Sequence, residues 1–186
     1  GMAKGEIVGC FGLTEADGGS DPASMRTVAK KVDGGYVLNG SKMWITNGLK
    51  ADWCCLLANT SEQGGPHRNK SLIVVPMDAP GITIRPSATM YDGTFANIFY
   101  DNVRIPAENL VGEVNDGWKV LTGALAFERG LVGGGIVLKV AHAFEQLRAH
   151  VMAGEGDQSL AGEPIVRDRM ATLASEIEIG RLLMMH

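Results

Sequence analysis

The amino-acid sequence predicts an α+β protein in which an antiparallel β-barrel or sandwich is followed by two long helices. Three observations carry this prediction. Short β-rich runs separated by turn residues fill the chain from Met25 to about Pro106. After Pro106 the apolar residues recur at helical spacing. A polar, glycine-containing connection then divides the helical part in two.

The predicted strands follow one another at short intervals. Asp33-Gly34 and Asn39-Gly40 are both strong signals for tight hairpins. The runs ADWCCLLA, SLIVVPM and GITIRPS are short, rich in apolar and β-branched residues, and bounded by Gly, Pro and polar residues. Residues 94–105 form a further run. Strands at this spacing are typical of an antiparallel barrel or sandwich.

Two helices are predicted after residue 106. The first runs from about Gly117 to Val151, and Pro164 is well placed to open the second. The apolar positions of the first are Leu121, Leu125, Val132, Ile136, Val140, Phe144 and Leu147, and those of the second are Val166, Met170, Leu173 and Ile177. Two helices with one stripe each cannot bury both stripes alone. We therefore expect them to pack on the β half or against helices outside this chain, which suggests a fragment or a protomer completed by a partner.

Composition excludes several classes of protein. Apolar residues make up 45% and charged residues 20% of the 186 residues, and the net charge is −4. No basic patch and no apolar run of membrane-span length stand out, so we expect neither a nucleic-acid nor a membrane partner. The four histidines lack metal-ligand spacing, so no metal site is expected. Cys10, Cys54 and Cys55 lack metal or redox spacing and indicate buried, reduced thiols in a cytoplasmic protein.

The loop FGLTEADGGSD, residues 11–21, is polar and rich in glycine. Gly18 and Gly19 permit backbone N–H groups to turn toward one point, and Ser20 adds a hydroxyl, so the loop suits an anion such as a phosphate. The loop matches neither the dinucleotide fingerprint nor the P-loop. The same residues are also ordinary turn material.

The stretch KMWITNG sets Trp44 two residues before Thr46 in a predicted strand. Residues i and i+2 of a strand share a face, so the indole and the hydroxyl point the same way. A flat ligand could be covered by Trp44 and bonded by Thr46. The alternative is a core tryptophan beside an ordinary strand threonine.

Glu128 lies on the apolar stripe of the first helix. Leu121, Leu125, Glu128 and Val132 are spaced by four, three and four residues, which places a carboxylate among apolar side chains. Burial disfavours a charged carboxylate and makes it a stronger base near neutral pH. The alternative is an ion pair with Arg129 or another arginine, although adjacent helix residues point about 100° apart.

Five stretches together resemble one family. FGLTEADGGSD, YVLNGSKMWITNG, DNVRIPAENLVGE, GW and LAFER occur in the order and spacing of the acyl-CoA dehydrogenase family. The resemblance implies a flavoenzyme with an N-terminal helical domain, a middle β-barrel and a C-terminal helical bundle. It implies that residues 1–107 are the middle barrel and residues 108–186 the first two helices of the bundle. The expected architecture is thus an antiparallel β-barrel followed by a long antiparallel helical hairpin.

The resemblance assigns roles to both sequence stretches of the barrel. The backbone of Phe11 and Leu13 and the hydroxyl of Thr14 resemble the family's contacts to the pyrimidine edge of the FAD isoalloxazine. Gly19 and Ser20 resemble its contacts to the pyrophosphate, and Ser20 also those to the CoA thioester. Trp44, Ile45 and Thr46 match the strand along the flavin, with Thr46 near N5.

The resemblance also implies the chemistry. A carboxylate removes a proton α to the thioester carbonyl of an acyl-CoA while the β-hydride goes to flavin N5. Most members place this base near the end of the C-terminal bundle. A minority place it immediately before the arginine of this helix, and LAFER puts Glu128 there, with Arg129 matching the arginine near the substrate channel. A role in fatty acid β-oxidation, an electron-transferring flavoprotein as partner, and a homodimer or homotetramer follow as expectations.

The chain departs from the family pattern in three places. Ala16 stands where proline is usual, and Ala126 where aspartate is common. MAGEGDQSLAGEP replaces the stretch with the Arg-x-x-Phe-Gly motif that holds the FAD diphosphate of a neighbouring subunit. An acyl-CoA oxidase or flavin monooxygenase on the same scaffold, and a non-catalytic assembly fragment, are the alternative functions.

Overall fold

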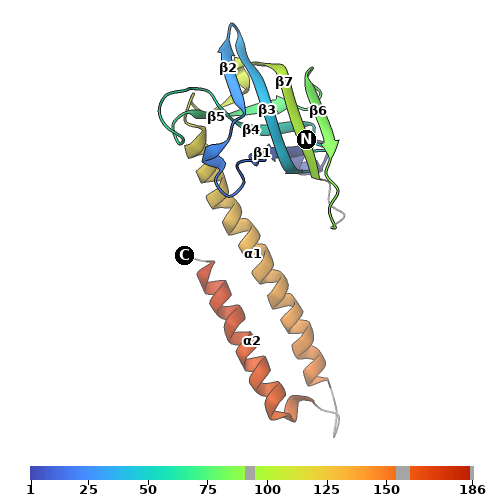
Figure 1. The fold of residues 1–186 in the computed structure, drawn as a ribbon. Helices are drawn as coiled ribbons and strands as arrows, with labels where there is room; N and C mark the ends of the chain where they lie inside the picture. Colours follow the sequence, from blue (N-terminus) through green and yellow to red (C-terminus); the bar gives the residue numbers. More distant parts are fainter. Residues whose placement is uncertain (91–94, 154–159, 185–186) are drawn as a thin grey trace. The chain divides into compact units, whose positions relative to one another are not determined.

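The computed structural model describes residues 1–90, 95–153 and 160–184. The chain forms two compact units, Gly1–Thr122 and Gly123–His186. The first contains all the strands and the second contains most of the helical part (Figure 1). Each unit is considered by itself below.

Within the described residues the first unit contains an eight-stranded sheet with the order β6-β7-β3-β2-β4-β5-β8, and β1 pairs with β4 beside this path. Its strands are β1 Gly9–Gly12, β2 Val28–Val32, β3 Gly35–Thr46, β4 Trp53–Asn59, β5 Lys70–Pro76, β6 Ile82–Pro86, β7 Phe95–Pro106 and β8 Leu110–Val111. Short 3-10 helices lie at Met2–Lys4 (η1), Pro22–Ser24 (η2) and Ala107–Asn109 (η3). Most pairs are antiparallel, but β1 runs parallel to β4. The α+β class is confirmed, with a mixed sheet in place of a wholly antiparallel one.

The two predicted hairpin turns have different outcomes. Asp33-Gly34 joins β2 to β3 as predicted, and Gly34 has a φ of 76°. Asn39-Gly40 does not form a hairpin, because both residues lie inside the twelve-residue strand β3. A register shift against β7 occurs between Leu38 and Gly40, and a Cβ at Gly40 would lie 2.5 Å from the Thr27 hydroxyl oxygen. The glycine therefore permits a close approach of neighbouring backbone within a continuous strand.

The sheet encloses one hydrophobic core. Its members come from β1 to β5, from β7 and, with Met77, from the turn after β5, and further side chains pack at the margin. The fully buried ones are Ala29, Leu38, Cys54, Leu56, Ala58, Ile73, Val75, Ala96, Ile98 and Val103. Burial of this apolar surface is the main source of the first unit's stability. The start of the first helix, through the buried Leu121, also belongs to this unit.

Two helices dominate the second unit. Helix α1, Gly117–Met152, and helix α2, Pro164–Leu183, match the predicted segments closely, and the short η5, Leu160–Gly162, precedes α2. The helices run antiparallel (Figure 1): a Cβ at Gly133 would lie 3.0 Å from the Met184 sulfur, and one at Gly180 would lie 3.6 Å from Val137. Residues 154–159 of the MAGEGDQSLAGEP stretch lie outside the described residues.

Helix α1 is long and apolar enough to cross a membrane by length and composition, with a mean hydropathy of 1.3 in its most apolar window. This corrects the expectation that no run of such length exists. The apolar character comes from the many Val, Leu and Ala residues of α1. Part of its surface lines a groove shared with α2, formed by Ile136, Val137, Val140, Leu173, Glu176, Ile177 and Gly180. The second predicted stripe, through Leu173 and Ile177, thus faces α1.

Candidate flavin-binding site and reactive helix

The loop after β1 closes on itself and caps the next helix. Glu15 and Gly18 exchange backbone hydrogen bonds, with N···O distances of 3.0 and 3.2 Å. Asp21 then caps η2 by accepting a bond from Ala23 N at 3.0 Å. Gly18 N–H is thus used inside the loop, and neither Gly18 nor Gly19 has positive φ. Anion binding by this loop stays a prediction. Gly19 and Ser20 are nevertheless exposed.

Strand β3 holds the loop by its backbone. Thr14 O accepts a hydrogen bond from Met43 N at 2.9 Å. A Cβ at Gly19 would meet nothing closer than the Thr14 methyl, at 3.9 Å. Thr14 therefore lies next to both Gly19 and the residue that precedes Trp44. The structure thus brings the two quoted sequence stretches together where the loop meets strand β3.

A β-bulge sets the orientation of Trp44. The register of β3 against β7 shifts between Lys42 and Ile45, and Trp44 has a φ of 58°, which is rare for a bulky residue. Lys42 and Ile45 are both buried although they are three residues apart. Trp44 is 49% exposed, and Thr46 is exposed as well. The reading of Trp44 as a core residue is therefore wrong.

The other residues predicted to bind the cofactor differ in how far their side chains are exposed to solvent. Phe11 on β1 is exposed, and Leu13 is partly buried. Ile45 is buried in the barrel core, so only its backbone is available to a ligand outside. Phe11, Trp44 and Thr46 thus offer exposed side chains, whereas Leu13 and Ile45 offer mainly backbone.

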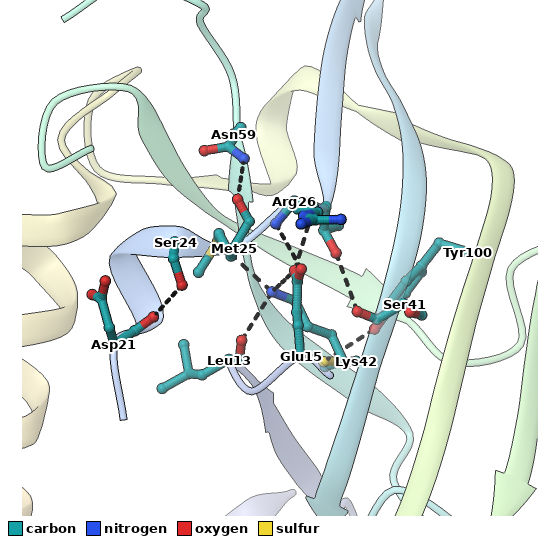
Figure 2. Close-up of polar contacts among 12 residues, drawn as sticks. Leu13, Glu15, Asp21, Ser24, Met25, Arg26, Ser41, Lys42, Asn59 and Tyr100 are labelled. Atoms are coloured by element: carbon teal, nitrogen blue, oxygen red, sulfur yellow. Dashed lines mark hydrogen bonds and ion pairs between the residues drawn. The ribbon is translucent and has the colours of Figure 1, made fainter. Parts of the chain in front are cut away.

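A buried ion pair beneath the loop was not predicted from the sequence. Lys42 Nζ lies 2.8 Å from Glu15 Oε1, and their side chains are 0% and 8% exposed. The Lys42 ammonium also donates to Leu13 O, at 3.0 Å (Figure 2). Glu15 accepts bonds from Arg26 N at 2.6 Å and Thr27 N at 3.1 Å. A lysine at an inward position of a strand was the available signal, because lysine is almost never fully buried without a partner.

The charges of this pair perturb each other. Burial tends to raise the pKa of Glu15, but the Lys42 ammonium and the hydrogen bonds from Lys42, Thr27 and Arg26 outweigh burial and hold that pKa below its ordinary value of 4.5. Burial lowers the pKa of Lys42 below 10.5, and the Glu15 carboxylate opposes this only in part. Glu15 is therefore ionised at neutral pH.

The three cysteines are buried, as predicted, and none forms a disulfide among the described residues. Cys54 accepts a hydrogen bond from the Tyr100 hydroxyl at 3.6 Å. Burial and the neighbouring Cys54 raise the pKa of Cys55 to about 11, so this thiol stays protonated at neutral pH. No cluster of three or more His, Cys, Asp or Glu that could hold a metal occurs in the described ranges.

Glu128 and Arg129 are placed differently from the expectation. Both lie on α1 in the second unit and are exposed. The burial expected for Glu128 is thus absent in this chain, because the apolar residues beside it have no cover. No ion pair joins Glu128 to Arg129 in the part of the chain that the structure describes. The two line an open groove of about 410 Å³ with Leu125, Val132, Gly133 and Ile136.

Comparison with protein families gives two adjacent matches. The family described as "Acyl-CoA dehydrogenase, middle domain" matches residues 10–103, and "Acyl-CoA dehydrogenase, C-terminal domain" matches residues 115–186. Together they cover most of the sheet, both helices and all the predicted site residues.

Individual proteins agree with these matches. The chain is 36% identical over 181 residues to the acyl-CoA dehydrogenase FadE34 of Mycobacterium tuberculosis, covering 97% of this chain and 24% of that protein. Among solved structures, a FAD-dependent dehydrogenase aligns with a TM-score of 0.86 and 26% identity, covering 98% of this chain and 50% of the other. The glutaryl-coenzyme A dehydrogenase complex with glutaryl-CoA aligns with a TM-score of 0.84 and 29% identity, covering 98% and 47%.

The chain therefore spans half the length of these relatives or less. Its two family matches, in the same order as the barrel and the helices, cover nearly all of its residues. On this basis the chain belongs to the acyl-CoA dehydrogenase family.

Proposed function

We propose that the protein catalyses FAD-dependent α,β-dehydrogenation of an acyl-CoA thioester. The observation that carries this proposal is the exposed Trp44, turned outward by a left-handed bulge residue beside the Thr14 backbone. A tryptophan in the left-handed region with about half of its surface exposed is strained, and a barrel core does not require it there. Such strain is typical of ligand-binding positions.

The residues present fit a flavin. An isoalloxazine is flat and apolar on its faces, with hydrogen-bonding groups along its pyrimidine edge. Phe11 and Trp44 present exposed aromatic surface, and the loop through Leu13 and Thr14 supplies polar backbone beside strand β3. The space beside Gly19, where a Cβ would meet only Thr14, admits a phosphate close to the backbone.

Each barrel residue would then hold one part of FAD. The Phe11 and Leu13 backbone and the Thr14 hydroxyl would bind the pyrimidine edge, and Gly19 and Ser20 the pyrophosphate. Trp44, the Ile45 backbone and Thr46 would lie along the ring, with Thr46 near N5. The bound flavin supplies an acceptor for the hydride that leaves the substrate β-carbon.

The helical residues would act on the substrate. Glu128 would remove the proton from the α-carbon of the thioester, and the electron pair of that C–H bond would form the α,β double bond as hydride leaves the β-carbon. Arg129 and Ser20 would bind the CoA and thioester side. For Glu128 to be a strong base, its groove on α1 must be covered in the working enzyme, since burial is what disfavours its charged form.

The proposed partners follow from the family resemblance. They are an acyl-CoA substrate, an electron-transferring flavoprotein that receives the electrons, and further copies of the chain in a homodimer or homotetramer. A cytoplasmic location is proposed on the three buried thiols, which suit a reducing compartment.

A visible spectrum tests the function directly. The purified protein, after addition of FAD and removal of the excess, should retain a flavin absorption band, and an acyl-CoA should bleach that band under anaerobic conditions. Retention of no flavin would contradict the proposal. Rapid return of the band on admission of oxygen, with peroxide release, would indicate an acyl-CoA oxidase instead.

A further inference from the structure

Two consecutive carbonyls of the proposed flavin loop are bonded to two consecutive residues of β3. Leu13 O accepts a hydrogen bond from Lys42 Nζ at 3.0 Å, and Thr14 O accepts one from Met43 N at 2.9 Å. One of these donors is backbone and the other is a fully buried side chain. Strand β3 therefore holds the path of the loop at Leu13 and Thr14.

The bond from Lys42 determines where the neighbouring N–H points. The peptide that joins Leu13 to Thr14 is planar and trans, so its C=O and N–H point in opposite directions. Because Leu13 O is directed inward to the buried Lys42 ammonium, Thr14 N–H is directed outward. Thr14 is bonded to Met43, the residue before the exposed Trp44, so this outward donor lies near the proposed flavin site.

Glu15 in turn fixes Lys42. Its Oε1 accepts bonds from Lys42 Nζ at 2.8 Å and Thr27 N at 3.1 Å, and its Oε2 accepts one from Arg26 N at 2.6 Å. Figure 2 shows the ammonium between Glu15, Leu13 and Met25. The carboxylate is thus held by the backbone that leads into β2, and the ammonium by the carboxylate.

We propose that Lys42 is a positioning residue for the flavin, held in place by Glu15, and that it sets the hydrogen bond that Thr14 N–H donates to the pyrimidine edge. This inference rests on the proposed function. The positive charge on Lys42 also polarises the Leu13–Thr14 peptide, which makes Thr14 N–H a stronger donor. Reduction adds electron density to the pyrimidine edge, so a stronger donor there favours the reduced flavin.

Three variants separate positioning from simple support of the fold. Lys42→Met removes the donor to Leu13 O, Glu15→Gln removes the counter-ion but keeps that donor, and Glu15→Gln/Lys42→Met removes both charges. Each is measured for FAD dissociation constant, flavin reduction potential and denaturant midpoint. Lys70→Met is the matched control, because Lys70 is a second buried lysine of the barrel, bonded to Pro66 O and Asn69.

We expect the variants to change the denaturant midpoint and the flavin properties independently of each other. Lys42→Met should weaken FAD binding about tenfold, the loss expected for one hydrogen bond. The preference for reduced flavin should also fall about tenfold, which lowers a two-electron potential by about 30 mV. Glu15→Gln should lower the denaturant midpoint yet keep both flavin values within about twofold of wild type.

The double variant decides the question. Its denaturant midpoint should recover toward that of wild type, because no unpaired charge stays buried, while the weakened FAD binding and lowered potential persist. Return of the flavin values together with stability would show a merely structural role and overturn the inference. So would an equal change in Lys70→Met. Failure of the wild-type protein to retain FAD would instead refute the proposed function itself, and this inference with it.

Discussion

The barrel buries its apolar residues, whereas the helical unit leaves most of its own exposed. Sixteen buried residues form a continuous core in the first unit. In the described part of the second unit, Val151 is the buried apolar side chain, while Phe127, Leu131 and Leu138 are largely exposed. A sheet that curves around a core covers its own interior, but two helices can cover only the faces that they turn toward each other.

This difference has a chemical counterpart. The barrel presents its proposed flavin residues on a surface that is fixed by internal hydrogen bonds and by the buried pair Glu15–Lys42. The helical unit presents Glu128 and Arg129 in an open groove. The residues proposed to bind the flavin thus lie in the barrel, and those proposed to act on the substrate lie on α1.

The largest expected effect comes from the helical unit. Glu128→Gln should reduce acyl-CoA turnover by about 10²–10⁴-fold, the usual contribution of a general base, while the flavin absorption of the protein stays unchanged. Anaerobic bleaching by acyl-CoA measures this rate. Glu145→Gln, on the same helix and exposed, is the control. Full turnover in Glu128→Gln would place the base on another residue and break the division between the two units.

The ion pairs of the two units should differ strongly. Lys42→Met leaves the Glu15 carboxylate buried without its partner and should lower the free energy of unfolding of the barrel by about 3–5 kcal/mol. Arg181→Ala removes a pair with Glu178 on the exposed face of α2 and should leave unfolding unchanged. Urea titration followed by tryptophan fluorescence measures both. Equal effects would show that burial does not distinguish these pairs.

Shortening an apolar side chain should also have different effects in the two units. Leu56→Ala creates a cavity at a fully buried position and should cost about 2–5 kcal/mol of unfolding free energy. Leu138→Ala, at an exposed position of α1, should change it by less than about 0.5 kcal/mol in this chain. A large loss in Leu138→Ala would mean that α1 is covered in solution, and analytical ultracentrifugation would then identify self-association.

Acid should destabilise the barrel through Glu15. Its folded pKa lies below the ordinary 4.5, so its stabilising contribution is complete above about pH 4.5 and is lost as pH falls through the lowered value. Denaturant midpoints measured between pH 7 and pH 3 should therefore fall below pH 4.5. The fall should be shallower in Glu15→Gln, which has no carboxylate to protonate, and identical slopes would contradict this assignment.

A small, stabilising effect is expected at Trp44. Asparagine tolerates a φ near 58° better than tryptophan, so Trp44→Asn should raise the free energy of unfolding by up to about 1 kcal/mol. The same change should weaken FAD binding, because it removes the aromatic surface. Phe99→Asn, at an exposed aromatic of β7, is the control and should leave FAD binding intact. A stability loss in Trp44→Asn would remove the argument from strain.

Turn and helix-start residues predicted most helices and strands correctly. The errors arose where contacts between residues distant in sequence decide the structure. Pro164 begins α2 as expected, because a proline at a helix start loses no hydrogen bond. Asn39-Gly40 carries the same dipeptide signal as a hairpin, yet pairing with β7 extends β3 through it. Lys42 was missed because its partner Glu15 is 27 residues away in the sequence. Glu128 was expected to be buried because periodicity identifies a face without showing what covers it.

The sequence by itself determined the α+β class, the two helices and the set of motifs that identify the family, since each depends on residues close together in the chain. Only the tertiary structure decided that Trp44 faces outward, that Lys42 and Glu15 meet beneath the loop, and that Thr14 lies beside β3. These facts depend on the register between strands distant in sequence. A single extra residue in a bulge reverses which side chains face the core. The apolar pattern of one strand does not show where such a bulge lies.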